Sequence, residues 1–105
     1  MENKPLTRSR AVELLAEIQS EIRALGVDRL ALFGSVGRDE ARADSDVDFL
    51  VQFAPGSKSY GRFLELADLL ETVLRHRVEL VTMEALSPYL GPRILAEAQD
   101  VLRPA

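Results

Sequence analysis

Apolar side chains recur at intervals of three and four residues in two long segments, the spacing that places them on one face of a helix. The first segment covers residues 7–25 and is followed by Gly26, a residue typical of helix C-termini. The second runs from Phe63 to Leu74, and the basic side chains that follow it suit the negative pole of a helix. The sequence therefore predicts an amphipathic helix in each segment.

A third helix is predicted near the C-terminus, with a less regular pattern. Ser87 and Pro88 form a typical helix start, with serine as N-cap and proline at the first helical position. Pro92 either interrupts this helix or restarts it, and the apolar face continues as far as Ala98.

Three short runs rich in branched and aromatic residues predict β-strands at residues 29–33, 47–53 and 78–81. The polar residues 34–44 follow the first run, and we expect them to form a turn and a short helical stretch. The resulting order is helix, strand, short helix, strand, helix, strand, helix. This order predicts an α/β domain with a small sheet covered by helices.

The length of the chain, 105 residues, predicts a single domain over residues 1–105, with a loose tail at residues 1–6. Hydrophobic residues make up 47% and charged residues 29%, which is ordinary for a soluble globular protein. No apolar run is long enough for a transmembrane helix, and the polar N-terminus does not resemble a signal peptide. We therefore expect no membrane association and a cytoplasmic location.

Charge and cysteine content restrict the possible chemistry. The chain has no cysteine, which excludes disulfides, thiolate catalysis and cysteine-based zinc sites. Its net charge is −4, whereas proteins that grip a nucleic-acid backbone usually present a basic face. We therefore do not expect direct binding to nucleic acid. A small anionic ligand would need basic side chains or metal ions at its site.

A Gly-Ser pair follows the first predicted strand. Gly34 would let a ligand approach the backbone closely, and the N–H groups of the next turn, with the Ser35 hydroxyl, can hold phosphate oxygens. A Gly-Ser pair after a strand is also a common ordinary turn, so the pair alone does not establish a phosphate site.

Two aspartates, Asp46 and Asp48, stand at the start of the second predicted strand. Strand alternation puts both carboxylates on one face of the sheet, where they can converge on Mg²⁺. The alternative is a solvated, acid-rich strand entry, which the apolar residues 49–51 disfavour. A calcium-binding EF-hand loop beginning at Asp44 is excluded because its sixth position is not glycine and its twelfth is not glutamate.

A third acid, Glu79, stands in an otherwise apolar predicted strand. A buried, unpaired carboxylate is costly, and a metal ion or a charged partner would remove that cost. The alternative is an edge strand with Glu79 facing water.

Together these residues resemble the signature of the nucleotidyltransferase superfamily that includes DNA polymerase beta. That signature is Gly-Ser, about ten residues, Asp-x-Asp and a third acid on a later strand, and here ten residues separate Ser35 from Asp46. The chain length, the LFGS and SDVD segments, Arg38 and the closing LSPYLGPRILAEA segment are similar to the minimal nucleotidyltransferases of bacteria and archaea. The resemblance covers residues 10–102 and implies a mixed three-stranded sheet packed with about four helices.

The resemblance also implies a nucleotide and a partner. Minimal nucleotidyltransferases are commonly paired with a HEPN toxin and act as antitoxins, by transferring AMP from ATP to a tyrosine hydroxyl of the toxin. Carried over to this sequence, Gly34 and Ser35 would bind the triphosphate of ATP. Arg38 would contact phosphate or anchor the loop, although a plain surface arginine is an equal alternative.

The acids take the catalytic roles in the same resemblance. Asp46 and Asp48 would ligate Mg²⁺, and Glu79 would stand in for a third acid that is usually aspartate, both as a metal ligand and in activating the acceptor. The extra methylene can displace the carboxylate, so the alternative function is a catalytically weak or inactive antitoxin that neutralises its toxin by binding alone. Transfer to a small molecule is a third possibility, although such relatives usually carry an added helical domain. The small size suggests a homo- or hetero-oligomer.

Overall fold

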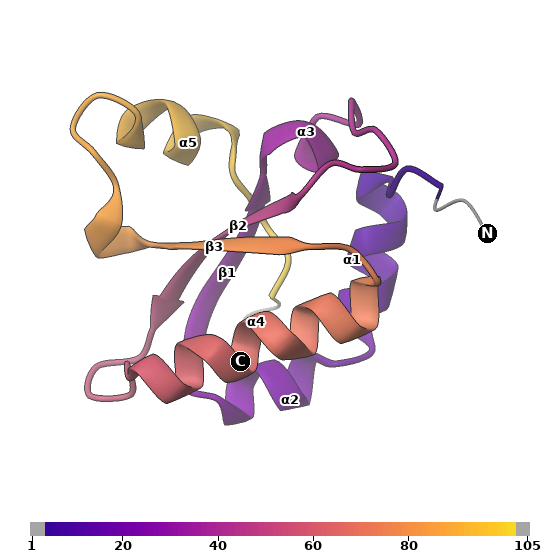
Figure 1. Cartoon of the computed structure of the whole chain (residues 1–105). Helices are drawn as coiled ribbons and strands as arrows, with labels where there is room; N and C mark the ends of the chain where they lie inside the picture. Colours follow the sequence, from indigo (N-terminus) through magenta and orange to yellow (C-terminus); the bar gives the residue numbers. More distant parts are fainter. Residues whose placement is uncertain (1–3, 103–105) are drawn as a thin grey trace.

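The computed structural model describes residues 4–102, which surround one mixed sheet of four strands (Figure 1). In the order of the sheet these are β3 (Val78–Thr82), β2 (Val47–Phe53), β1 (Val27–Phe33) and β4 (Gln99–Asp100). β1 is antiparallel to both of its neighbours, whereas β2 and β3 are parallel. The predicted mixed sheet is confirmed, but it has four strands rather than three. The sequence does not predict β4 because its two residues are both polar and exposed.

The first predicted helix is two helices, α1 (Arg8–Ala16) and α2 (Gln19–Ala24). At the break, Gln19 Nε2 donates hydrogen bonds to the carbonyl oxygens of Leu15, at 3.2 Å, and of Val101, at 2.9 Å. The prediction of one continuous helix is therefore wrong. The apolar spacing continues across the break, so the sequence pattern does not reveal it.

The second predicted helix is confirmed as α4 (Tyr60–Leu74). Ser59 caps its N-terminus by accepting a hydrogen bond from the N–H of Arg62 at 3.1 Å. At the other end, Arg75 adopts a left-handed conformation with φ 56°, which terminates the helix.

The C-terminal helix begins later than predicted. A short 3₁₀ turn, η1 (Met83–Ala85), is followed by a turn in which Ser87 Oγ accepts from the N–H of Leu90 at 2.9 Å. The helix proper, α5 (Gly91–Glu97), has Pro92 in its first turn. A start at the serine-proline pair is therefore wrong, and Pro92 begins the helix rather than interrupting it.

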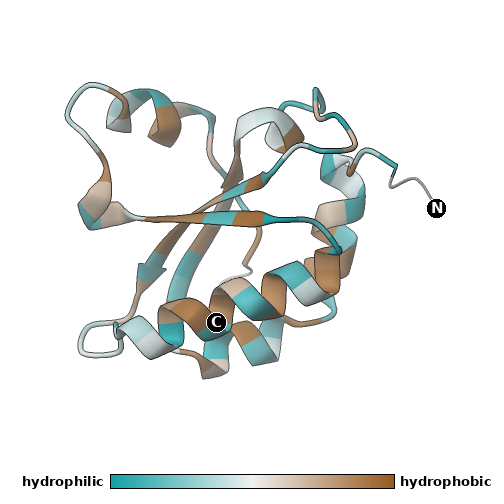
Figure 2. Ribbon diagram, viewed as in Figure 1, coloured by the Kyte–Doolittle hydropathy of each residue, from teal (hydrophilic) through white to brown (hydrophobic). Residues whose placement is uncertain are grey.

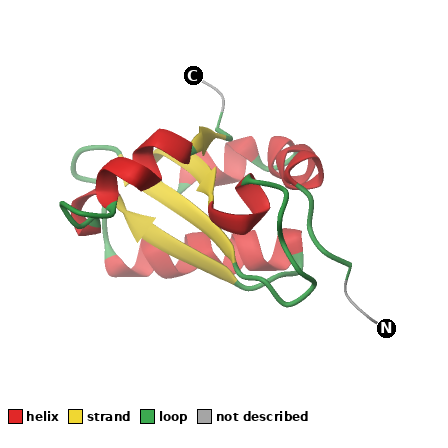
Figure 3. Ribbon diagram, turned by 90° about the horizontal axis from the view of Figure 1, so that it is seen from above, coloured by secondary structure: helices red, strands yellow, loops and turns green. Residues whose placement is uncertain are grey.

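The helices cover the two faces of the sheet unequally (Figures 1 and 3). α1, α2 and α4 pack on one face and form the main core with it, and the ribbon of these helices alternates between hydrophobic (brown) and hydrophilic (teal) residues in Figure 2. Leu6, in the segment before α1, is also buried there; the remaining predicted tail at residues 1–3 lies outside the described residues. The opposite face carries a small cluster of Ala31, Phe33 and Leu50 under η1 and α5. Within residues 4–102, no helix is long and apolar enough to cross a membrane.

Candidate active site

The two aspartates lie where β2 enters the sheet. Val47, Phe49 and Val51 are buried in the main core, so the alternate side chains of β2 point to the opposite face. Asp48 is half-buried on that face, and Asp46, one residue outside the strand, is exposed. The predicted pair therefore lies at one end of the strand, with Asp48 on the face with fewer helices and Asp46 lining a pocket with residues 71 and 75–77.

Gly34 lies directly against Asp48. Its neighbour Phe33 is the register partner of Asp48 in the antiparallel pair of β1 and β2. A Cβ atom on Gly34 would collide with the Asp48 carboxylate, and the φ of Gly34, 75°, lies in the left-handed region that favours glycine. Space and backbone conformation thus both require glycine where the turn meets the acid.

Ser35 is half-buried within α3 (Gly34–Gly37), the single helical turn that follows β1. Its carbonyl oxygen accepts a hydrogen bond from the N–H of Glu40 at 2.8 Å, which closes the loop. Among the described residues, its hydroxyl has no hydrogen-bond partner. This hydroxyl is therefore available to a ligand.

Glu79 is the neighbour of Asp48 on the next strand. The parallel register of β2 and β3 pairs the two residues, so their side chains leave the same face of the sheet. β3 is an edge strand and Glu79 is exposed, so a buried carboxylate, one of the two alternatives for this residue, is not observed. The alternative placement, facing water from an edge strand, is the observed one, and it still brings a third acid beside Asp48.

These three carboxylates lack a counter-charge of their own. Across residues 4–102, no hydrogen bond or ion pair is made by the side chain of Asp46, Asp48 or Glu79. Burial and the nearby charges of Glu79 and Asp46 raise the pKa of Asp48 to about 6, with Arg38 acting in the opposite direction. This end of the sheet therefore concentrates negative charge that a cation would neutralise.

The donor chemistry fits Mg²⁺, which binds carboxylate oxygens and completes its shell with water and substrate phosphates. In the described part of the chain, no three His, Asp or Glu side chains lie close enough together to form a complete ligand set from protein alone. An ion that arrives with its nucleotide needs few protein ligands, and Asp46, whose charge acts on Asp48, and Asp48 itself are the carboxylates that would hold it.

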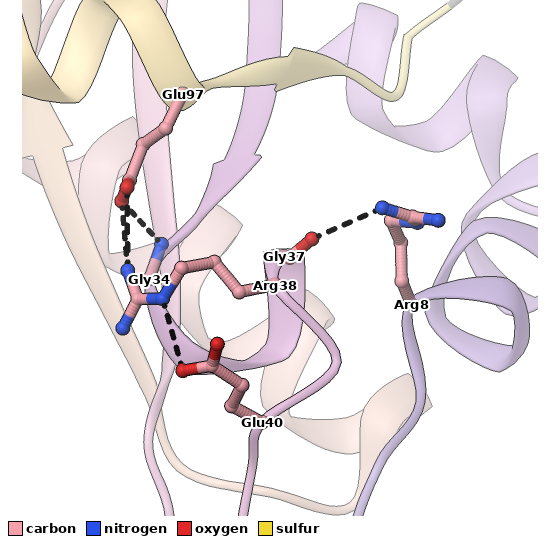
Figure 4. Close-up of polar contacts among 6 residues, drawn as sticks. All are labelled: Arg8, Gly34, Gly37, Arg38, Glu40 and Glu97. Atoms are coloured by element: carbon pink, nitrogen blue, oxygen red, sulfur yellow. Dashed lines mark hydrogen bonds and ion pairs between the residues drawn. The ribbon is translucent and has the colours of Figure 1, made fainter.

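A fourth acid, Glu97, reaches the same turn from the end of α5 (Figure 4). Its Oε1 accepts hydrogen bonds from the backbone N–H of Gly34, at 3.1 Å, and from Arg38 Nη1, at 3.2 Å. Its Oε2 lies 3.3 Å from the same Nη1, and Glu40 accepts from Arg38 Nε at 3.4 Å. Arg38 is thus part of the site, held beside the Gly34 turn by two carboxylates.

A pocket of about 290 Å³ opens between α3 and α5 at this point. It offers an apolar wall, two guanidinium groups and one acid, from Phe33, Gly34, Arg38, Leu90, Arg93, Ile94 and Glu97. Its size is close to the lower end for small-molecule sites. Neither Arg93 nor Glu97 is predicted from the sequence as a site residue, because helical spacing marks only the apolar face of α5 and both residues resemble ordinary surface charges.

Comparison with known proteins gives a consistent relationship. Residues 12–101 match the family model of the nucleotidyltransferase domain. A Methanocaldococcus jannaschii protein named "Putative protein adenylyltransferase" is 44% identical over 73% of this chain and 82% of its own length. The protein adenylyltransferase MntA of Thermococcus cleftensis is 38% identical over 88% of this chain and 93% of its own length.

Solved structures share the fold. One named "putative minimal nucleotidyltransferase" is 36% identical, with a TM-score of 0.69 over 84% of this chain and 93% of that one. A complex of a tri-AMPylated HEPN toxin of Shewanella oneidensis with its MNT antitoxin matches with a TM-score of 0.54 at 22% identity, over 82% of this chain and 70% of that one. The family match spans most of the chain, and the chain belongs to the nucleotidyltransferase family and is a nucleotidyltransferase.

Proposed function

We propose that this nucleotidyltransferase is an antitoxin that transfers AMP from ATP, with Mg²⁺, to a tyrosine hydroxyl of a HEPN-type toxin. Relatives named protein adenylyltransferase support a protein acceptor and AMP as the transferred group. The HEPN toxin with which a structural neighbour is complexed supports the choice of partner.

The observation that carries the proposal is a set of three carboxylates that form no ion pair among the described residues, beside a glycine turn whose Ser35 hydroxyl has no partner there. Asp46 and Asp48 would hold Mg²⁺, and Asp48 touches Gly34, so the ion would lie next to the turn. Ser35 and Arg38 would bind the triphosphate on the other side of that glycine. A metal and a polyphosphate are needed together in nucleotidyl transfer, and this arrangement provides for both at one place.

In the proposed step, the acceptor oxygen forms a bond to the α-phosphorus of ATP, and the bond from that phosphorus to the bridging oxygen of the β-phosphate breaks. Pyrophosphate leaves, and the proton of the acceptor hydroxyl passes to the carboxylate of Glu79. Glu79 is exposed on an edge strand, so a side chain of a partner protein can reach it. Bound Mg²⁺ would neutralise charge on the phosphates. Asp46, Asp48 and Arg38 orient the triphosphate for in-line attack.

The test incubates the protein with ATP labelled on the α-phosphate, Mg²⁺ and a purified HEPN-type toxin. We expect label on a tyrosine of the partner, and a loss of at least about a hundredfold in rate for Asp46→Asn and Glu79→Gln. Asp68→Asn is the matched control, because Asp68 is exposed on α4, across the sheet from the site, and should keep the wild-type rate.

Two outcomes would contradict the proposal. A tight complex that never becomes labelled would leave an antitoxin that acts by binding alone. Label on the partner that survives in both site variants would mean that the transfer uses other residues than these.

A further inference from the structure

The acid at the end of α5 occupies the donors that a phosphate would need. Glu97 Oε1 accepts from the N–H of Gly34 and from Arg38, and both of its oxygens lie within 3.3 Å of the guanidinium nitrogen. A carboxylate bound to a backbone N–H and an arginine presents the same chemistry as a phosphate oxygen bound there. In Figure 4 the Glu97 side chain points down from α5 onto the glycine turn and the arginine.

The two anions cannot share this position. A phosphate oxygen that accepted from Gly34 would lie within van der Waals contact of Glu97 Oε1, which accepts from the same N–H at 3.1 Å. Glu97 also adds to the negative potential at Asp48, so it disfavours an approaching polyphosphate as long as it stays in place.

We propose that Glu97 is an internal stand-in for a nucleotide phosphate, and that the nucleotide binds by displacing it from Gly34 and Arg38. This inference rests on the proposed function, since it concerns how the same site takes up its nucleotide. Glu97 then sets the affinity and selects for ligands with enough charge to displace a carboxylate, such as a nucleoside triphosphate or tripolyphosphate.

The local structure permits the exchange. Glu97 is the last residue of α5, and its contact with Arg38 is exposed to solvent on the arginine side, so the side chain can turn outward without unpacking the core. Arg93, one turn earlier in α5, lines the same pocket. It is a cation to which the released carboxylate or the incoming phosphates can move.

The nucleotide can bind only molecules in which the turn is free. Its apparent affinity is therefore the intrinsic affinity multiplied by the fraction of such molecules. If this contact keeps the turn closed in roughly nine molecules out of ten, its removal tightens binding about tenfold. If Glu97 only held Arg38 in place for phosphate, replacing Glu97 would change the nucleotide affinity in the opposite direction, because binding would become weaker.

The experiment measures the dissociation constants of ATP and of tripolyphosphate, with Mg²⁺, for the wild type, Glu97→Gln and Glu97→Ala. We expect both variants to bind both ligands about tenfold more tightly. Glu13→Gln is the matched control, because Glu13 is likewise paired with an arginine, Arg10, but lies on α1 away from the turn, and its affinity should stay within about twofold of the wild type. The glutamine variant keeps the shape of the side chain, so it tests the inference even if the alanine variant unfolds.

A second measurement follows the Gly34 amide by NMR. Its signal should move on Glu97→Gln, and addition of ATP should move the wild-type and variant signals to the same position. Unchanged or weaker binding by the Glu97 variants, with normal wild-type binding, would overturn this inference alone. Absence of ATP and tripolyphosphate binding in every protein, the wild type included, would overturn the proposed function and this inference with it.

Discussion

At the scale of single residues, the site depends on a glycine at position 34, where any side chain would collide with Asp48. Gly34 leaves the space that the Asp48 carboxylate fills, and its backbone conformation is one that other residues adopt at a cost. The turn that would bind phosphate and the acid that would bind metal are therefore positioned by the same contact. The function of the site and the stability of the fold meet at this position.

Gly34→Ala should destabilise the protein by about 2–4 kcal/mol, from the left-handed backbone and from the collision with Asp48. Gly61→Ala is the control: Gly61 lies in the first turn of α4 with open space around it, and alanine there should stabilise by about 0.5 kcal/mol. Urea unfolding of the two variants measures both effects. Equal stabilities would mean that the turn relaxes away from Asp48.

The residues of the site divide into those that the sequence predicts and those that only the structure reveals. Gly34, Asp46 and Asp48 stand out by spacing, because a strand and a turn fix their relative positions over a short stretch of chain. Glu79 lies beside Asp48 because of the register between β3 and β2, which no local sequence pattern specifies. Glu97 lies in α5, 63 residues after Gly34 in the sequence, so their contact depends on the tertiary fold and cannot be read from a local pattern.

At the scale of elements, the predictions succeed where a segment has its own periodicity. β2 is found at its predicted bounds, because its branched and aromatic residues stand between an acidic, polar segment and a proline-glycine turn. β4 and the break between α1 and α2 have no such local pattern. Both are created by the return of the C-terminal segment, whose Val101 carbonyl receives the Gln19 side chain.

Gln19→Ala should therefore cost about 1–2 kcal/mol, because it leaves the carbonyl of the buried Val101 without this donor. Ser20→Ala, at the exposed neighbouring position, should change the free energy of unfolding by less than about 0.5 kcal/mol. Thermal unfolding of the pair measures the difference. A Gln19 variant as stable as the Ser20 variant would show that the helix break is held by apolar packing alone.

At the scale of the whole molecule, the sheet has one face buried by three helices and one face left partly open for chemistry (Figure 3). The open face brings Asp48 close to the charges of Glu79 and Asp46, which Arg38 offsets only in part, so the fold carries an electrostatic cost there when Asp48 is ionised. The dependence of stability on pH should reveal that cost.

Asp48 has a pKa of about 6 in the folded protein, above its value of about 3.9 in an unfolded chain. The folded state therefore binds more protons between these two values, and the contribution of Asp48 to stability falls as pH rises through this window. In the presence of a chelator, Asp48→Asn should be more stable than the wild type by about 1 kcal/mol at pH 7, once solvent screening is allowed for.

Most of the gain should disappear near pH 4, where Asp48 is protonated in the folded protein and about half protonated in the unfolded chain, and transfer activity should be lost at every pH. Unfolding curves at pH 4 and pH 7 measure the difference, with Asp28→Asn as the control for an exposed acid outside the site. A stability difference that did not change with pH would contradict the charge explanation.

The pairing of β1 with β2 also has a consequence for the order of folding. Phe33 and Asp48 become neighbours by closing only the short loop between two adjacent strands, so the Gly34 turn and both aspartates can assemble early. Glu79 can pair with Asp48 only after α4 has formed and β3 has joined the sheet. The contact between Glu97 and Gly34 requires nearly all of the remaining chain. During synthesis, the half of the site that would bind metal and phosphate would take shape while the half that receives the acceptor is still to be made.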